Sequence, residues 1–205
     1  MKEGGRIAKV FGEAKGILAG ERTALNFLGH LSGIATKTDS FVKKVSGLNV
    51  KIMDTRKTTP NFRLLEKYAV RVGGGYNHRM GLNDAVLIKD NHLKVMKGKI
   101  GDLVKKVRSG APPSMKIEVE AKDLSEVEDA LSGKPDIIML DNMSVSKVSE
   151  AVEFVRKSGC NVLLEVSGGI TLENVREYAE TGVDIISVGE LTHSVRSLDI
   201  SMEFE

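Results

Sequence analysis

The stretch DIIMLDNMSVSKVSEAVEFVRKSGCNVLLEVSGG, residues 136–169, decides the fold. It opens with a short apolar run and continues with a segment of helical period, in which Val145, Val148 and Val152 recur on one face. A second apolar run follows Gly159. Runs that are apolar on successive residues are typical of strands buried on both faces. The stretch therefore predicts two parallel strands joined by a crossover helix.

The same alternation continues on both sides of this stretch. A further helix is expected over 171–181, where Gly182 would end it, and an earlier one over Glu21–Ser46, broken near Ser32-Gly33. About six strands are expected, at 50–54, 85–90, 115–121, 136–141, 161–167 and 184–189. This order predicts the α/β class, with a preceding N-terminal helical segment and a parallel sheet that is either open or closed into a barrel.

Composition excludes several classes of partner. The 205 residues include 30 Lys and Arg against 28 Asp and Glu, a net charge of +2, and no Trp. So small a net charge gives no overall field for nucleic acid or a membrane surface, and we expect neither partner. No apolar run reaches the roughly 18 residues of a membrane span. Cys160 is the single cysteine, which we expect to be a small buried residue of a cytoplasmic protein.

Polar residues follow the strands at the points where they end. In parallel α/β folds the C-terminal ends of the strands share one rim, where ligands bind. A lone Asp after a strand is also a common helix cap or turn former, so only the joint occurrence of cations and carboxylates predicts a site. The strand-end residues are Asp54, Lys89-Asp90, Glu120, Asp141, Ser167-Gly168-Gly169 and Gly189-Glu190.

A first group of these residues is cationic. Arg56 and Lys57 follow the first strand, His78 and Arg79 lie after three consecutive glycines, and Lys89 ends the next strand. Arg presents a planar fork that matches carboxylate or phosphate, and Lys a compact point charge. Solvated surface charge is the ordinary alternative, but their common position at strand ends favours a site for a small molecule with two or more negative charges.

A second group is acidic. Glu120 and Asp141 end neighbouring strands and would project into the same rim. Facing carboxylates suit Mg²⁺, ribose hydroxyls or a developing positive charge. A purely structural ion pair with Lys89 is the alternative.

A third group resembles a phosphate-binding turn. Ser167, Gly168 and Gly169 precede a predicted helix, and Gly189 ends the next strand. Glycines let backbone N–H groups approach a phosphate at a helix N-terminus. His193 lies just beyond and could contact the same phosphate, although a lone His is more often an ordinary surface residue.

Eight phrases resemble quinolinate phosphoribosyltransferases in order and spacing, from about residue 10 to the C-terminus. DTRKTTP together with GG-x₃-HR-x-GL-x-D is the most specific combination, and nicotinate-using relatives share the barrel without these phrases. The phrases are ERTALN (21–26), DTRKTTP (54–60), GGG (73–75), NHRMGL (77–82), IKDNH (88–92), EVE (118–120), LDN (140–142) and SGGI (167–170).

The resemblance implies the reaction of quinolinate with phosphoribosyl diphosphate, which requires Mg²⁺ and releases CO₂ and diphosphate. It implies that the quinolinate carboxylates are bound by Arg56, His78, Arg79 and Lys89, with Lys57 between quinolinate and the diphosphate. It implies that Glu120 and Asp141 hold the ribose hydroxyls. Through Mg²⁺, the same two residues would stabilise the positive charge that develops at the anomeric carbon. It assigns the 5-phosphate to Ser167, Gly168, Gly169, Gly189 and His193.

The resemblance also carries expectations about organisation. Arg22 reaches a neighbouring subunit's site in this family, which implies a homodimer or a higher homo-oligomer. Family members carry an N-terminal α/β sandwich domain, so residues 1–16 are interpreted as its remnant and 17–205 as the catalytic barrel.

Three alternatives remain beside this assignment. One is the ribosyltransferase-like paralogue associated with molybdenum transport. Another is a catalytically idle or truncated barrel that binds phosphosugar or a partner chain. The third, a sugar-phosphate isomerase or aldolase, would need a base or a Schiff-base lysine and no dicarboxylate clamp.

Overall fold

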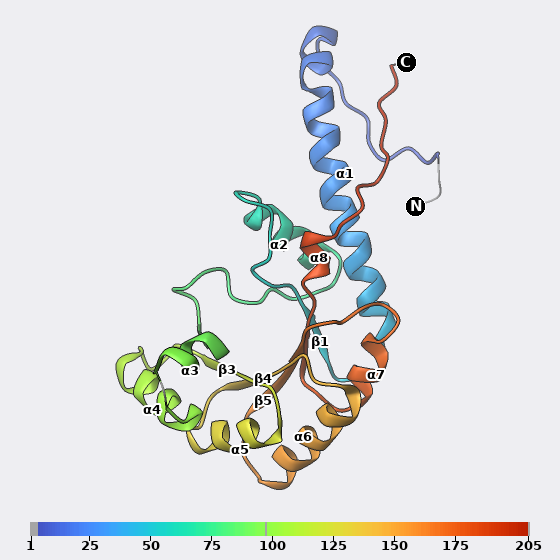
Figure 1. The fold of residues 1–205 in the computed structure, drawn as a ribbon. Coiled ribbons are helices and arrows are strands. Elements are labelled where there is room, and N and C mark those ends of the chain that lie inside the picture. The colour runs from blue at the N-terminus through green and yellow to red at the C-terminus, as the bar shows by residue number, and fades with distance from the viewer. Residues whose placement is uncertain (1–3, 97, 205) are drawn as a thin grey trace.

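The protein forms a single curved sheet of parallel strands with helices on its outer side (Figure 1). A computed structural model describes residues 4–96 and 98–204. Its strands are β1 Lys51–Met53, β2 Val86–Ile88, β3 Ile117–Ala121, β4 Ile137–Asp141, β5 Leu163–Ser167 and β6 Ile185–Ser187. Its helices are α1 Ala14–Lys44, α2 Arg63–Val72, α3 Asp90–Met96, α4 Ile100–Gly110, α5 Leu124–Ser132, α6 Val145–Lys157, α7 Val175–Glu180 and α8 Glu190–His193.

The sheet is an open barrel, as the α/β prediction allowed. Its strand order is β1-β6-β5-β4-β3-β2, and every paired neighbour is parallel. In the described residues β1 and β2 are the two edges and are not paired with each other. The segment at Tyr76 partly covers the free edge of β1, because the Tyr76 N–H donates to Ile52 O at 2.8 Å.

Side-chain alternation gives the strands two different faces. On β3, Ile117, Val119 and Ala121 are fully buried and belong to the apolar core that the helices cover. Glu118 and Glu120 point to the opposite, inner face, because successive side chains of a strand alternate. The inner face of this barrel therefore carries charge where the outer face carries the apolar core.

Two glycines of α1 allow the C-terminal segment to pack directly against this helix. A Cβ at Gly29 would lie 2.7 Å from Leu198 O, and one at Gly33 would overlap Arg196 O. The Leu198 N–H donates to Gly29 O at 3.0 Å. The predicted break near Ser32-Gly33 is wrong, because Gly33 serves this close approach and α1 continues through it to Lys44.

The other boundaries agree with the sequence except in detail. All six predicted strands are present, each shorter than expected at one or both ends. The predicted helix at 171–181 is shorter, since α7 begins at Val175 with Asn174 at its N-cap. Gly182 follows it with φ +88°, a left-handed conformation that ends a helix. Cys160 is exposed, which corrects the expectation that it is buried.

None of the helices in residues 4–96 and 98–204 combines the length and apolar character that a membrane span requires.

Two matching arrangements hold the strands together at their N-terminal ends. Arg108 donates to Asp136 Oδ2 at 2.5 Å, and the same oxygen accepts the Ile117 N–H at 2.9 Å. Arg156 and Asp184 repeat the pattern at 2.7 Å with the Leu164 N–H as the second donor, also at 2.7 Å. Each Asp therefore ties the start of one strand to the start of its neighbour and to the end of a helix.

Candidate functional site

The C-terminal ends of the strands form one rim, here called the mouth, and it collects the predicted acidic and phosphate-binding residues. Asp141 is paired in register with Ser167 on the neighbouring strand. Glu120 is the penultimate residue of β3, which is paired with β4, and it has the same inward parity as Glu118. The mouth thus places a half-buried Asp141 and a largely buried Glu120 on adjacent strands, as the sequence predicted.

The segment after β1 brings Arg56 and Lys57 to the mouth. Its backbone is fixed by two side chains, since Arg63 donates to Arg56 O at 3.3 Å and Thr192 donates to Lys57 O at 2.7 Å. Arg56 Nε is buried and has no hydrogen-bond acceptor. A buried guanidinium donor without an acceptor is costly, and a bound anion would remove that cost.

Lys57 lies close to the turn between β6 and α8. A Cβ at Gly189 would lie 3.3 Å from Lys57 Cδ and 3.1 Å from His193 Nε2. A larger residue at position 189 would therefore push on both side chains. His193 itself is exposed, and its Nδ1 contacts Ser194 Oγ at 2.7 Å.

A buried ion pair holds the segment that carries His78 and Arg79. Lys67 on α2 is paired with Asp54, and neither side chain is more than 1% exposed. Asp54 also accepts from Asn77 Nδ2 at 2.6 Å and from the His78 N–H at 2.8 Å. Lys67 Nζ donates to His78 O at 2.9 Å. The buried pair thus fixes the backbone of this segment from both sides.

The His78 side chain points into the barrel, below the mouth. Its Nε2 lies 3.1 Å from Glu118 Oε2 and 3.4 Å from Glu165 Oε2. Burial opposes a charged ring, but hydrogen bonds and Coulombic attraction to the two carboxylates outweigh it and raise the pKa of His78 to about 10. Burial and the neighbouring Glu165 likewise raise the pKa of Glu118. The Arg79 N–H donates to His78 Nδ1 at 2.8 Å.

Arg79 is positioned close to a second guanidinium. Its Nη1 donates to Ala85 O at 3.1 Å, which fixes one edge of the fork. Burial and the charge of Arg56 lower the pKa of Arg79. The two positive charges repel each other, and an anion bound near both would relieve that repulsion.

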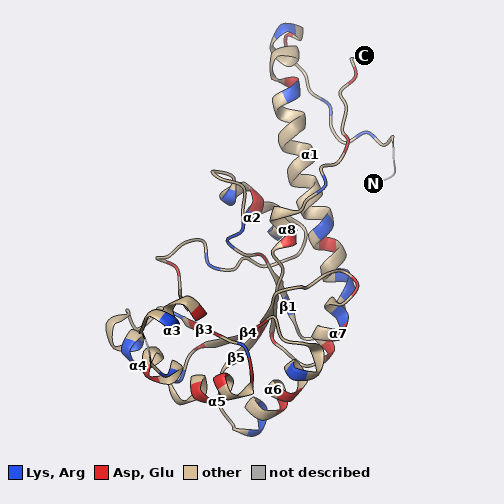
Figure 2. Cartoon of the chain, in the orientation of Figure 1, with Lys and Arg blue, Asp and Glu red and all other residues tan. Residues whose placement is uncertain are grey.

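Lys89 and Glu120 are ion-paired at 2.9 Å, as the structural alternative anticipated. The Lys89 side chain remains 47% exposed and the Glu120 side chain 10%. Lys89 is therefore tethered at the mouth with donors left for a ligand. An acidic and a cationic group therefore contact each other at the mouth. Along the chain as a whole, Lys and Arg positions are interspersed with Asp and Glu positions (Figure 2).

The Ser167-Gly168-Gly169 turn requires its glycines. Gly168 and Gly169 have φ of +91° and +64°. A Cβ at Gly168 would overlap the side-chain amide of Asn142, whereas Gly169 has open space around it. The turn does not open a helix directly, because α7 begins only at Val175. Its N–H groups are therefore available through the glycine turn itself, not through a helix N-terminus.

The run Gly73–Gly75 has a packing role. A Cβ at Gly75 would lie 2.7 Å from Thr38 Cγ2, and one at Gly73 would overlap Ala35 O. These glycines let the end of α2 pack closely on α1 and so set the position of the His78 segment.

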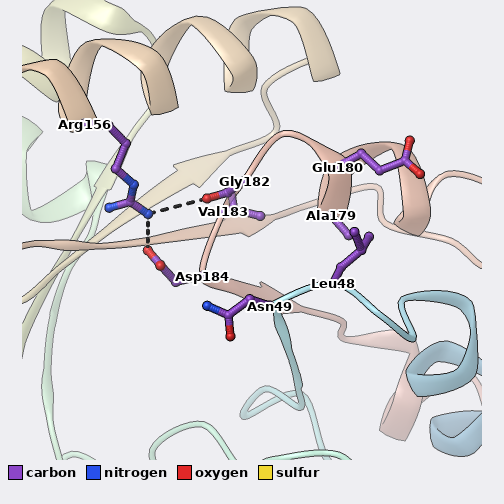
Figure 3. A pocket seen from close by; sticks show the side chains of 8 residues that line it. All are labelled: Leu48, Asn49, Arg156, Ala179, Glu180, Gly182, Val183 and Asp184. Atoms are coloured by element: carbon purple, nitrogen blue, oxygen red, sulfur yellow. Dashed lines mark hydrogen bonds and ion pairs between the residues drawn. The ribbon is translucent and has the colours of Figure 1, made fainter.

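Two pockets lie away from the mouth. One, of about 420 Å³, is at the N-terminal ends of β1 and β6, and its Arg156 already donates to Asp184 and Gly182 O (Figure 3). The other, of about 290 Å³, lies between α1 and residues 197–200 and is lined by Arg22. Arg22 is thus the one predicted site residue on α1, and the pocket that it lines beside the C-terminal segment includes none of the other predicted site residues.

Sequence reasoning missed two residues that build this site. Glu165 is fully buried within the apolar run VLLEV, and a carboxylate at an inward position of such a strand was the available signal. Lys67 lies on an amphipathic helix, where nothing local separates a buried lysine from the solvated ones around it.

Comparisons with known proteins agree with this geometry. Residues 34–203 match the family model "Quinolinate phosphoribosyl transferase, C-terminal domain". The chain is 48% identical over 203 residues to a nicotinate-nucleotide pyrophosphorylase [carboxylating] of Mycobacterium leprae, covering 99% of this chain and 71% of that protein. It is 47% identical over 205 residues to a probable enzyme of that name from Methanocaldococcus jannaschii, covering 97% and 72%.

Solved structures show the same relationship. The crystal structure of NadC from Streptococcus pyogenes superposes with a TM-score of 0.88 at 41% identity, covering all of this chain and 72% of that one. A NadC deletion mutant gives 0.89 at 44% identity, covering 94% and 67%. The chain therefore belongs to the quinolinate phosphoribosyltransferase family and contains its C-terminal barrel domain.

Proposed function

We propose that this protein transfers a phosphoribosyl group from phosphoribosyl diphosphate to quinolinate with loss of CO₂, giving nicotinic acid mononucleotide for NAD biosynthesis. The observation that carries the proposal is the buried Arg56 Nε without an acceptor, beside a mouth that holds Glu120 and Asp141 on adjacent strands. A carboxylate of the substrate can satisfy such a guanidinium donor, and Glu120 and Asp141 suit a ribose that develops positive charge. The names of the relatives describe the same reaction.

The chemistry needs no covalent nucleophile. The pyridine nitrogen forms a bond to the anomeric carbon as the bond from that carbon to the diphosphate oxygen breaks. Positioning and electrostatic stabilisation serve such an oxocarbenium-like transition state. The positively charged ring nitrogen then stabilises the electron pair that stays on the adjacent ring carbon when the carboxylate leaves as CO₂, and that carbon takes up a proton. Arg56 and Arg79 would hold the remaining carboxylate. Lys57 would lie between quinolinate and the diphosphate.

The acidic residues at the mouth fit Mg²⁺, which prefers carboxylate oxygens and keeps several waters. One oxygen of Glu120 contacts Lys89 at 2.9 Å, and one oxygen of Asp141 accepts from Asn142 Nδ2 at 3.0 Å. The two would hold the ion together with the ribose hydroxyls. When bound, Mg²⁺ would supply neutralising charge for the departing diphosphate. Ser167, Gly168, Gly169, Gly189 and His193 would bind the 5-phosphate.

We further propose a cytoplasmic homodimer or a higher homo-oligomer. Arg22 supports the assembly, because it is exposed on α1 and lies away from its own mouth, as expected of a residue lent to a neighbour. The interpretation of residues 1–16 as the remnant of a preceding domain belongs to the same proposal.

The test is a release assay with quinolinate labelled at the departing carboxylate. Purified protein, phosphoribosyl diphosphate and Mg²⁺ should release labelled CO₂, and leaving out either phosphoribosyl diphosphate or Mg²⁺ should abolish the release. Folded protein that binds phosphoribosyl diphosphate and releases no CO₂ would instead be an idle barrel. Turnover of nicotinate in place of quinolinate would favour the molybdenum-associated paralogue.

A further inference from the structure

The segments that carry Arg56 and Arg79 are tied to each other at their starts by the buried ion pair of Asp54 and Lys67. Asp54 accepts the His78 N–H at 2.8 Å, and Lys67 donates to His78 O at 2.9 Å. The pair therefore fixes the first residues of both segments. The residues that follow, which include both guanidinium groups, are held by other contacts.

Arg63, the first residue of α2, links the same two segments further along. Its Nη2 donates to Arg56 O at 3.3 Å, and its Nη1 donates to O of Met80, the residue after Arg79, at 3.1 Å. Its Nε donates to Thr58 Oγ1 at 3.0 Å. Each nitrogen of this guanidinium thus holds a group of the protein, and the bridge joins the two segments that present Arg56 and Arg79.

We propose that Arg63 is a positioning residue that sets the separation of Arg56 and Arg79 and thereby the affinity for quinolinate. The inference rests on the proposed function, because it concerns how two residues are placed for one carboxylate of that substrate. Arg63 acts through the backbone of its neighbours and not by contact with the substrate.

Both ends of the bridge lie on ordered peptide groups. Arg56 O also accepts the Thr58 N–H at 3.0 Å, so the first end is part of a turn. The Met80 N–H donates to Asp84 Oδ2 at 2.8 Å, which fixes the second end from the other side. Loss of Arg63 would therefore let one ordered turn shift relative to the other.

The position of Arg63 is unfavourable for a cation as such. The N-terminus of a helix carries partial positive charge, which opposes a cation in the first turn. The three acceptors of Arg63 are two carbonyl oxygens and a hydroxyl oxygen, none of which carries a charge. The shape of the side chain therefore accounts for the arginine, because a planar fork spans several acceptors and a lysine ammonium does not.

The bridge also acts against a repulsion. Arg56 and Arg79 repel each other, as the lowered pKa of Arg79 records. Without a bound anion this repulsion tends to move the two segments apart, and Arg63 holds them together. The site is then arranged before the substrate arrives, and less free energy of binding is lost to ordering it.

Calorimetric titration of quinolinate and of phosphoribosyl diphosphate, each alone with Mg²⁺, tests the proposal. Arg63→Gln should raise the Kd for quinolinate about 10- to 100-fold, as for a small misplacement of binding groups. Arg63→Lys keeps the charge and should lose nearly as much. The Kd for phosphoribosyl diphosphate should change less than about threefold, because Lys57 is held separately by Thr192. Arg176→Gln, at an exposed ion pair on α7, is the matched control and should leave both values unchanged.

Three outcomes would overturn the proposal. Equal losses for both substrates would make Arg63 a general structural residue. Full recovery with Arg63→Lys would reduce it to a point charge, and an unchanged Kd for quinolinate would leave it without a role in binding. Circular dichroism and thermal unfolding identify a variant that does not fold, and the other variant then carries the comparison.

Hydrogen exchange of the protein without substrates gives an answer that needs neither binding nor activity. In Arg63→Gln the amides of Thr58 and Met80 should exchange at least about tenfold faster, while those of β4 should not change. Unaltered exchange at both amides would overturn the proposal. Absence of quinolinate binding to the unmodified protein would instead reject the proposed function and leave the exchange result standing, so the two failures are distinguishable.

Discussion

Asp54 and Lys67 form an ion pair that the protein removes almost completely from water, with 0% and 1% of their side chains exposed. Burial raises the pKa of Asp54 and lowers that of Lys67, while the mutual attraction of the pair opposes both shifts. Such a pair adds little stability compared with apolar residues, yet removing one partner leaves a buried charge. Its evident role here is to fix the His78 segment at the mouth.

Removal of Lys67 should therefore be costly. Lys67→Met should lower the free energy of unfolding by about 3–5 kcal/mol, because Asp54 is left buried and unpaired. The measurement is urea denaturation followed by circular dichroism. Asp54→Asn in the same chain should restore much of the loss, and Lys94→Met, at an exposed i,i+4 pair on α3, should change little. Equal stability of the Lys67 and Lys94 variants would contradict the buried pair.

The glycine turn after β5 offers a matched comparison at two adjacent positions. Gly168→Ala should raise the KM for phosphoribosyl diphosphate at least about tenfold, since the new Cβ overlaps Asn142 and must displace the turn. Gly169→Ala has open space and should cost only the left-handed backbone conformation, on the order of 1 kcal/mol of stability. Steady-state kinetics at saturating quinolinate compares the two variants, and a KM for phosphoribosyl diphosphate that Gly168→Ala leaves unchanged would remove the turn from phosphate binding.

The KM for quinolinate should depend on the shape of the cation at position 56 as well as on its charge. Arg56→Lys keeps the charge and loses the planar fork whose buried Nε has no partner in the described structure. We expect the KM for quinolinate to rise at least about tenfold, a loss of about 1.4 kcal/mol in binding. Arg176→Lys, at an exposed pair on α7, is the control and should be neutral. An unaltered KM would mean that Arg56 acts only as a point charge.

Lowering the pH should weaken the Asp136 contacts at the N-terminal ends of the strands and so lower the melting temperature. Partial burial of Asp136 opposes its ionisation, but hydrogen bonds from Arg108, the Ile117 N–H and Lys116 outweigh it and lower its pKa to about 2. The depressed pKa means that this stabilisation is fully present above the unfolded value near 3.8 and is lost as pH falls towards 2. Melting temperatures measured from pH 5 to pH 2 should fall steeply, and Asp136→Asn should flatten the lower part of that curve. Parallel curves for the two proteins would contradict this.

The sequence predicted the alternation of strands and helices well, because that order follows from local periodicity. Stretch 136–169 is the clearest case: its strands and helix differ from the prediction by a few residues at most. The strand-end rule also located Glu120, Asp141 and Ser167, because parallel strands bring their C-terminal ends together whatever the details of packing.

What could not be predicted depends on contacts between distant segments. Gly33 was interpreted as a helix break, since no local signal indicates that Arg196 would pack against it. Whether His78 faces solvent or Glu165 depends on which way one ring turns, and Lys67 is buried only because Asp54 lies opposite. Residue type alone does not distinguish a charged residue inside a barrel from a charged residue on its surface.

The close packing of the C-terminal segment on α1 sets the order in which the fold can be completed. Lys37 on α1 donates to Ser194 O, 157 positions later, and the surface at Gly29 and Gly33 is covered by residues that follow β6. During synthesis, α1 is made before all six strands, and the segment that packs against it is made only after β6. A contact so distant in sequence is slow to form. In the nascent chain, this face of α1 therefore stays uncovered until the residues after β6 have been made.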